Sequence, residues 1–230
     1  MKLIKADRYL YLIWKDPRTR QNFAIGKLGK GDKYFFEYFD DVGKAEKNGW
    51  VKFEVFPDEK VYESDILFPV FASRLPDRKR RDIEKILDKY GLSTFDEFEL
   101  LRKSEGRLPI DTYSFIDPIF PNDQTVQRDF YIMGVRYNTP CKGENCSLLP
   151  LINVGDELVF EKEPENKFDA NAIKVQTPVG DVLGYVPRYY NESILERLEK
   201  NMTYSCKIIE INTSQDCSEC IKVRLNMPKE

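Results

Sequence analysis

Short runs rich in aromatic and aliphatic residues, one of them alternating with polar residues, lie between turn residues along the first sixty positions, a pattern typical of β-strands. These runs predict four strands, over residues 8–14, 21–28, 33–39 and 50–56, of which 21–28 shows the alternation. Asp16-Pro17 ends the first strand, and the glycine-containing residues 29–32 form a hairpin turn between the second and third. The N-terminal part is therefore expected to be an antiparallel β-meander.

The spacing of apolar residues then changes to that of helices. Residues 66–71 predict a short buried helix or turn, and a longer helix starts after Pro76-Asp77 and ends at Gly91. The apolar face of this longer helix consists of Ile83, Ile86, Leu87 and Tyr90. The basic run over residues 78–81 is interpreted as its solvated first turn, with an anionic partner as the alternative.

Short apolar segments separated by turn residues fill the second half of the chain. They predict strands over residues 130–137, 154–160, 172–175, 182–186, 204–211 and 221–225. A helix capped by Asn191, with Ile194, Leu195 and Leu198 on one face, lies between the fourth and fifth strands. This order predicts a small, partly open β-barrel of the oligonucleotide-binding (OB) type.

Pro109, Pro118 and Pro121 interrupt the chain between these two patterns. We therefore expect a first domain at residues 1–108, a linker at 109–126 and a second domain at 127–230. The predicted fold class is α+β with two domains, a meander with helices followed by an OB-like barrel with one helix.

Charge differs between the halves and limits the function classes. Residues 1–110 carry 23 Lys and Arg against 20 Asp and Glu, whereas residues 111–230 carry 13 against 19. The acidic second half argues against a non-specific nucleic-acid coat. The chain has no histidine, which excludes imidazole catalysis and histidine-ligated metals.

The sequence contains no apolar run of membrane-spanning length, begins without a signal-peptide core, and has five cysteines. We therefore expect a cytoplasmic protein with no membrane contact and no disulfide framework. The alternating carboxylates Glu161, Glu163 and Glu165 lack a second converging acidic cluster, so we predict that the protein is not an enzyme.

No cofactor is expected to be required, but a structural zinc ion is one interpretation of the cysteines. Cys141 and Cys146 form one pair and Cys217 and Cys220 another, each in a polar hairpin tip. Four thiolates in two pairs could bind Zn²⁺ tetrahedrally. The alternative is exposed thiols without a metal.

Three stretches of the second half carry a family resemblance. They are Gly134-Val135-Arg136-Tyr137, the run Glu163-Pro164-Glu165-Asn166-Lys167-Phe168-Asp169-Ala170-Asn171-Ala172-Ile173-Lys174-Val175, and Gly184-Tyr185-Val186-Pro187-Arg188. Over about residues 128–226 the sequence resembles the HIRAN domain, a small β-barrel. The resemblance implies binding of single-stranded DNA with its free 3′ end in a pocket, by residues Arg136, Tyr137, Phe168, Asp169, Asn171 and Arg188.

The chemistry of these residues suits that ligand. Tyr137 and Phe168 offer ring faces on which bases can stack. Arg136 and Arg188 could hold phosphates, and the Asp169 carboxylate could accept the hydrogen bond of a terminal hydroxyl. The alternative is a structural role, in which Asn166, Asp169 and Asn171 organise a tight turn, Tyr137 is core, and Arg188 pairs with Glu165.

A second resemblance covers about residues 8–92. The motif Gly26-x-Leu28, the strand Phe36-x-Tyr38, Ser64 and the stretch Phe71-Ala72-Ser73-Arg74-Leu75-Pro76-Asp77 resemble the N-terminal subdomain of HipA-type toxin kinases. That subdomain is not catalytic and packs against a kinase body, which has no counterpart in this sequence. The resemblance implies a separately encoded HipA-like kinase as partner, in a toxin–antitoxin or DNA-damage role.

The sequence thus predicts a non-catalytic two-domain adaptor. Its first domain is expected to dock a HipA-type kinase and its second to bind single-stranded DNA 3′ ends. The alternative is a pure protein-interaction module whose barrel has lost DNA binding, favoured by the acidic second half and by Phe168 in place of the family's usual tyrosine.

Overall fold

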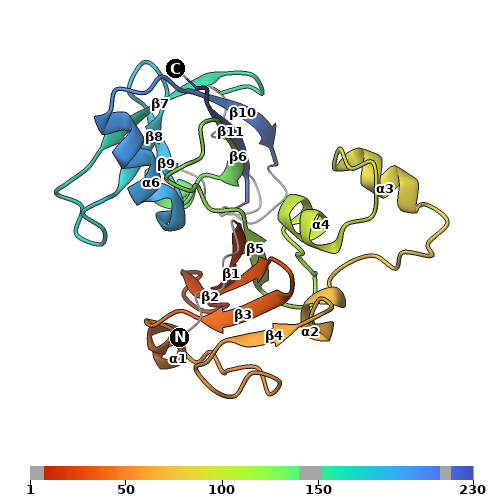
Figure 1. Ribbon diagram of the computed structural model, residues 1–230. Helices are drawn as coiled ribbons and strands as arrows, with labels where there is room; N and C mark the ends of the chain where they lie inside the picture. The colour runs from red at the N-terminus through yellow and green to blue at the C-terminus, as the bar shows by residue number, and fades with distance from the viewer. Residues whose placement is uncertain (1–7, 140–151, 213–218, 230) are drawn as a thin grey trace. The chain divides into compact units, whose positions relative to one another are not determined.

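The computed structural model describes residues 8–139, 152–212 and 219–229. The chain divides after Pro118 into two compact units, Met1–Pro118 and Ile119–Glu230, each with one antiparallel sheet and few helices (Figure 1). No helix within the described ranges is long and apolar enough to cross a membrane.

The N-terminal unit is a five-stranded antiparallel sheet in the order β4-β3-β2-β1-β5. Its strands are β1 (Tyr9–Lys15), β2 (Asn22–Lys30), β3 (Tyr34–Tyr38), β4 (Tyr62–Ser64) and β5 (Tyr113–Ile116). The predicted meander is confirmed for β1 to β3. Gly29 lies opposite Phe35, and a Cβ on it would come within 2.0 Å of the Phe35 ring, so any side chain at this position would displace that ring.

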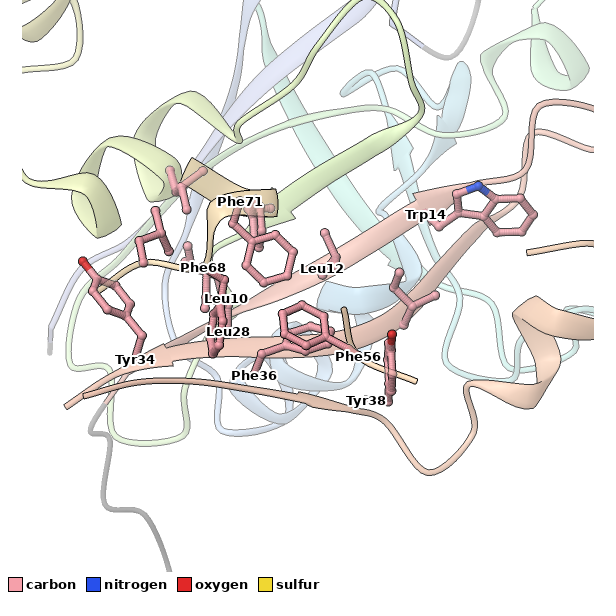
Figure 2. Close-up of a cluster of buried hydrophobic side chains, with 14 of the residues drawn as sticks. Leu10, Leu12, Trp14, Leu28, Tyr34, Phe36, Tyr38, Phe56, Phe68 and Phe71 are labelled. Carbon is pink, nitrogen blue, oxygen red and sulfur yellow. The ribbon is translucent and has the colours of Figure 1, made fainter. Parts of the chain in front are cut away.

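One face of this sheet carries an aromatic core (Figure 2). Phe36 of β3 packs against Phe56 and Phe71, with ring centroids 4.6 and 5.2 Å away. Phe71 belongs to helix α2 (Pro69–Ala72), which confirms the predicted short buried helix. Burial of these rings supplies the apolar contact area that holds the helix on the sheet.

The predicted fourth strand, over residues 50–56, is wrong. The Phe56 N–H donates to the Phe53 carbonyl at 2.9 Å, so the segment turns back instead of joining the sheet. Trp50 and Phe56 enter the core while Val51 is 78% exposed, a pattern that resembles strand alternation without strand pairing. Helix α1 (Gly43–Lys47) precedes this segment, and β4 occupies the edge of the sheet instead.

Helices α3 (Ile83–Lys89) and α4 (Glu97–Ser104) follow α2. Helix α3 begins later than predicted, so the basic residues 78–81 lie in the turn before it and not in its first turn. The carboxylate of Asp77 accepts the Lys79 N–H at 2.7 Å, which stabilises this turn in place of a helical start.

Both units incorporate part of residues 109–126, the segment predicted as a linker. Strand β5 pairs with β1, and the buried guanidinium of Arg74 makes two 2.7 Å contacts with the Asp111 carboxylate. In the C-terminal unit, which begins at Ile119, the Arg197 guanidinium donates to the Phe120 carbonyl at 2.7 Å. The spacing of prolines does not report these long-range partners.

The C-terminal unit is a six-stranded antiparallel sheet in the order β6-β11-β10-β7-β8-β9. Its strands are β6 (Val126–Tyr131), β7 (Glu157–Lys162), β8 (Ile173–Gln176), β9 (Val182–Tyr185), β10 (Ser205–Ile211) and β11 (Ile221–Met227). A β-bridge between Met133 and Tyr185 joins the two ends, so the sheet curls into the predicted OB-like half-barrel. A Cβ on Gly184 would lie 2.3 Å from the Met133 carbonyl oxygen, so this closure requires a glycine.

Two predicted boundaries in this unit are wrong. The strand expected over residues 130–137 ends at Tyr131, and residues Val135–Asn138 form the short helix α5. Gly134 starts this helix with a φ of 73°, a left-handed conformation that glycine adopts without strain. The long helix α6 (Arg188–Glu199) follows Pro187 directly, so Asn191 is a buried residue of its first turn and not its cap.

Candidate nucleic-acid interface

The loop between β7 and β8 displays Phe168. Asn166 organises this loop, because its side-chain oxygen accepts the N–H groups of Phe168 and Asp169 at 2.9 and 3.2 Å. Its amide nitrogen donates to the Glu163 carboxylate at 2.5 Å. The Phe168 ring is left 87% exposed, which is unusual for a large apolar side chain on a loop this well bonded.

Asp169 is the hydrogen-bonding centre of the same loop. One carboxylate oxygen, Oδ1, accepts the Asn171 N–H at 2.9 Å. The other, Oδ2, accepts Arg188 Nε at 3.2 Å and Asn191 Nδ2 at 2.9 Å. The carboxylate is therefore held both by its own turn and by the first turn of α6.

Arg188 connects the loop to α6. Besides its bond to Asp169, its Nη2 donates to the Phe168 carbonyl at 2.5 Å. The Arg188 side chain nevertheless remains 71% exposed. Such a guanidinium is fixed in position by two protein contacts and still accessible to an anion from solvent.

Arg136 and Tyr137 lie on α5. The Tyr137 ring is 77% exposed, and the guanidinium carbon of Arg136 lies 4.8 Å from its centroid, within cation–π distance. Asn138 donates to the Gly134 carbonyl at 3.0 Å and closes the short turn that presents both side chains.

Tyr185 of β9 lies between α5 and the Phe168 loop. A Cβ placed on Gly134 would lie 3.7 Å from the Tyr185 ring and 3.9 Å from the Tyr137 ring, so the two rings flank this glycine. The Tyr185 side chain is hydrogen-bonded to Glu163 and Asn166. Burial and then the Glu163 carboxylate raise the pKa of Tyr185, so the phenol stays neutral. Tyr185 therefore contacts the Gly134 turn on one side and, through Asn166, the loop that carries Phe168 on the other.

Glu163 completes this network. Hydrogen bonding, first from Asn166 and also from Lys174 and Tyr185, lowers its pKa. Lys174 lies 3.1 Å from Glu163 and 3.3 Å from Glu161, so these carboxylates are paired with a lysine.

Comparison with known proteins gives a family for this half of the chain. Residues 127–227 match the family of HIRAN domains. This segment is a HIRAN domain. The matched range spans the half-barrel, α5, the Phe168 loop and α6, and it contains every residue of the surface described above.

Two solved structures are similar to the HIRAN domain. A protein from Lactobacillus plantarum is 21% identical, with a TM-score of 0.36 over 45% of this chain and 94% of that one. The HIRAN domain of human HLTF is 16% identical, with a TM-score of 0.34 over 46% of this chain and 77% of that one. No curated protein matches the chain.

The structure brings the predicted site residues of the HIRAN domain into two adjoining groups. Phe168, Asp169, Asn171 and Arg188 form one hydrogen-bonded cluster, in which Arg188 pairs with Asp169 and not with Glu165. Arg136 and Tyr137 form the other, and Tyr137 is exposed and not part of the core.

Sequence reasoning missed Tyr185 and Asn191 as members of this surface. Tyr185 lies within one of the quoted motifs, so its aromatic ring beside a glycine was a usable signal. Asn191 gave the opposite signal, because an asparagine near a helix start predicts a cap.

The zinc prediction falls largely outside the described residues, since Cys141, Cys146 and Cys217 belong to the remaining segments. Cys206 and Cys220 are buried, and burial raises the pKa of Cys206 to about 12. Among the residues that the structure describes, no three His, Cys, Asp or Glu side chains are grouped so that they could hold a metal ion.

Proposed function

We propose that the HIRAN domain binds DNA and that it holds the 3′ end of a single strand. The observation that carries this proposal is the pair of exposed aromatic rings, Tyr137 and Phe168, each beside an exposed arginine, with Tyr185 bonded to the loop of Phe168 and lying beside the turn of Tyr137. Exposed rings next to cations suit unstacked bases linked by phosphates.

Each side chain has a role in this proposal. Bases stack on Phe168 and Tyr137, and phosphates pair with the guanidinium groups of Arg188 and Arg136. Asp169 accepts the terminal hydroxyl at its carboxylate, beside the Asn171 N–H that already donates to it. The Asn166 bonds to the Phe168 and Asp169 N–H groups also fix the backbone of this loop before the ligand arrives, which reduces the entropy lost on binding.

The acidic balance of the second half is compatible with a terminus-specific site. Arg136, Lys167 and Arg188 are exposed at this surface. At physiological ionic strength the Debye length is about 8 Å, so distant carboxylates are screened from a ligand held here. We expect binding of a strand end without tight binding along a duplex.

Fluorescence anisotropy with 5′-labelled oligothymidylates tests the proposal. The full chain is titrated into strands that end in a 3′-hydroxyl or a 3′-phosphate, and into a duplex without overhangs. We expect preference for the free 3′-hydroxyl. Equal, negligible binding to all three would refute it.

The second candidate function is a protein-interaction module, favoured by the observation that three donors already satisfy the Asp169 carboxylate. In that case Asp169→Ala and Arg188→Ala would leave capture of a protein partner intact. No DNA signal would then exist to be lost.

For the N-terminal unit we propose docking of a separately encoded HipA-like kinase, and the whole chain is proposed to be a non-catalytic adaptor. The support is the motif resemblance over residues 8–92, and the family match does not extend to it. Co-expression with a HipA-type kinase lacking its N-terminal subdomain tests this. Failure to co-purify would remove the docking role and leave the DNA proposal untouched.

A further inference from the structure

Asn191 is the least expected side chain of the interface. It lies in the first turn of α6, is only 4% exposed, and donates from Nδ2 to Asp169 Oδ2 at 2.9 Å. Its other amide atom, Oδ1, is buried and has no hydrogen-bond partner among the described residues. An unsatisfied buried acceptor is destabilising, so the fold alone does not favour an asparagine at this position.

The two side-chain donors to Asp169 Oδ2 differ in their surroundings. The Arg188 side chain is 71% exposed, and its Nε lies 3.2 Å from Oδ2. Asn191 is buried, and its Nδ2 lies 2.9 Å from the same oxygen. A phosphate from solvent can compete with Asp169 for the Arg188 guanidinium, because both are anionic partners for the same fork of N–H groups. No ligand can compete for the Asn191 amide without opening the protein.

We infer that Asn191 is a positioning residue that holds Asp169 in place when Arg188 turns to a phosphate of the bound strand. In the free protein Arg188 rests on Asp169. When DNA binds, the guanidinium transfers to the phosphate, and the buried amide keeps the carboxylate oriented toward the strand terminus. This inference rests on the proposed function. It adds that the Arg188 guanidinium exchanges the Asp169 carboxylate for a DNA phosphate when the strand binds.

Asn191→Leu tests the inference because leucine has a similar branched shape and removes both the donor and the unsatisfied acceptor. We expect about a tenfold loss of the preference for a 3′-hydroxyl over a 3′-phosphate, with a thermal unfolding midpoint close to that of the unmodified chain. Asn226→Leu is the matched control, because Asn226 contacts Gln127 at the opposite end of β6 from Met133. The control should keep the preference.

A measurement on the unmodified chain covers the case in which Asn191→Leu does not fold. In ¹⁵N NMR spectra with a 3′-hydroxyl oligothymidylate, the Arg188 Nε signal should shift, while the Asn191 side-chain amide stays protected from hydrogen exchange. An unshifted Arg188 signal, or an Asn191 amide that exchanges freely, overturns the inference.

The possible failures are distinguishable. If the unmodified chain shows no preference for a free 3′ end, the proposed function fails and this inference fails with it. If the unmodified chain shows the preference and Asn191→Leu retains it, only the inference is wrong. If Asn191→Leu lowers the unfolding midpoint and weakens binding to every oligonucleotide alike, Asn191 is only structural and the inference is wrong.

Discussion

Removing the Phe168 ring should weaken DNA binding and leave the fold intact. The ring is 87% exposed, so Phe168→Ala gives up little buried apolar area, and its effect on unfolding should stay within about 0.5 kcal/mol. Stacking of one base on an aromatic side chain contributes about 1–3 kcal/mol, which corresponds to a rise in Kd of about 5- to 150-fold.

The assay is anisotropy titration of a 3′-hydroxyl oligothymidylate together with thermal unfolding of each variant. Val179→Ala is a matched control, because Val179 is 86% exposed in the turn between β8 and β9 of the same domain. Phe168→Tyr should bind like the unmodified chain, since the ring face is kept. If Phe168→Ala and Val179→Ala bind equally well, base stacking on this loop is refuted.

Three further predictions follow from named contacts. Arg188→Gln should reduce the slope of log K against log salt by about 0.7–1, as measured by anisotropy at several salt concentrations, and an unchanged slope would contradict a phosphate contact. Arg74→Met should destabilise the chain by roughly 3 kcal/mol in urea unfolding, because it leaves the Asp111 carboxylate without its two 2.7 Å partners. Burial acts to raise the pKa of Asp111, but hydrogen bonding from Arg74 lowers this pKa overall. The stabilisation from the Arg74–Asp111 pair is therefore present above the ordinary carboxyl pKa and is lost as the pH falls through the lowered value. Gly184→Ala should lower the free energy of unfolding by about 3 kcal/mol or more, because the added Cβ would overlap the Met133 carbonyl oxygen. Thermal unfolding measures this as a lower midpoint, and an unchanged midpoint would contradict the close approach.

The pattern of apolar runs bounded by turn residues predicted most strands of both sheets because strands bury their apolar side chains in a core. It failed at residues 50–56, where Trp50 and Phe56 are buried by a turn and not by a strand ladder. It also failed at the end of β6, where Gly134 starts a helix with a left-handed φ. In both places a local backbone turn outweighs the side-chain pattern, and that pattern does not encode the turn.

The candidate site was predictable as residue types but not as a network. Motif positions indicated Phe168, Asp169 and Arg188, and the structure places them in hydrogen-bonding contact. The role of Asn191 depends on a contact across 22 residues to Asp169, which no local pattern reports. The sequence likewise left open whether Tyr137 is core or exposed, and it is exposed on α5, a helix that the apolar pattern did not predict.

In the proposed DNA site, α5, the Phe168 loop and the start of α6 form one binding surface. Chemical-shift mapping of the full chain with a 3′-hydroxyl oligothymidylate tests it directly. We expect the largest shifts at Tyr137, Phe168, Tyr185 and Arg188, and we expect them to saturate together. Shifts confined to other strands of the barrel, or two groups that saturate at different concentrations, would contradict it.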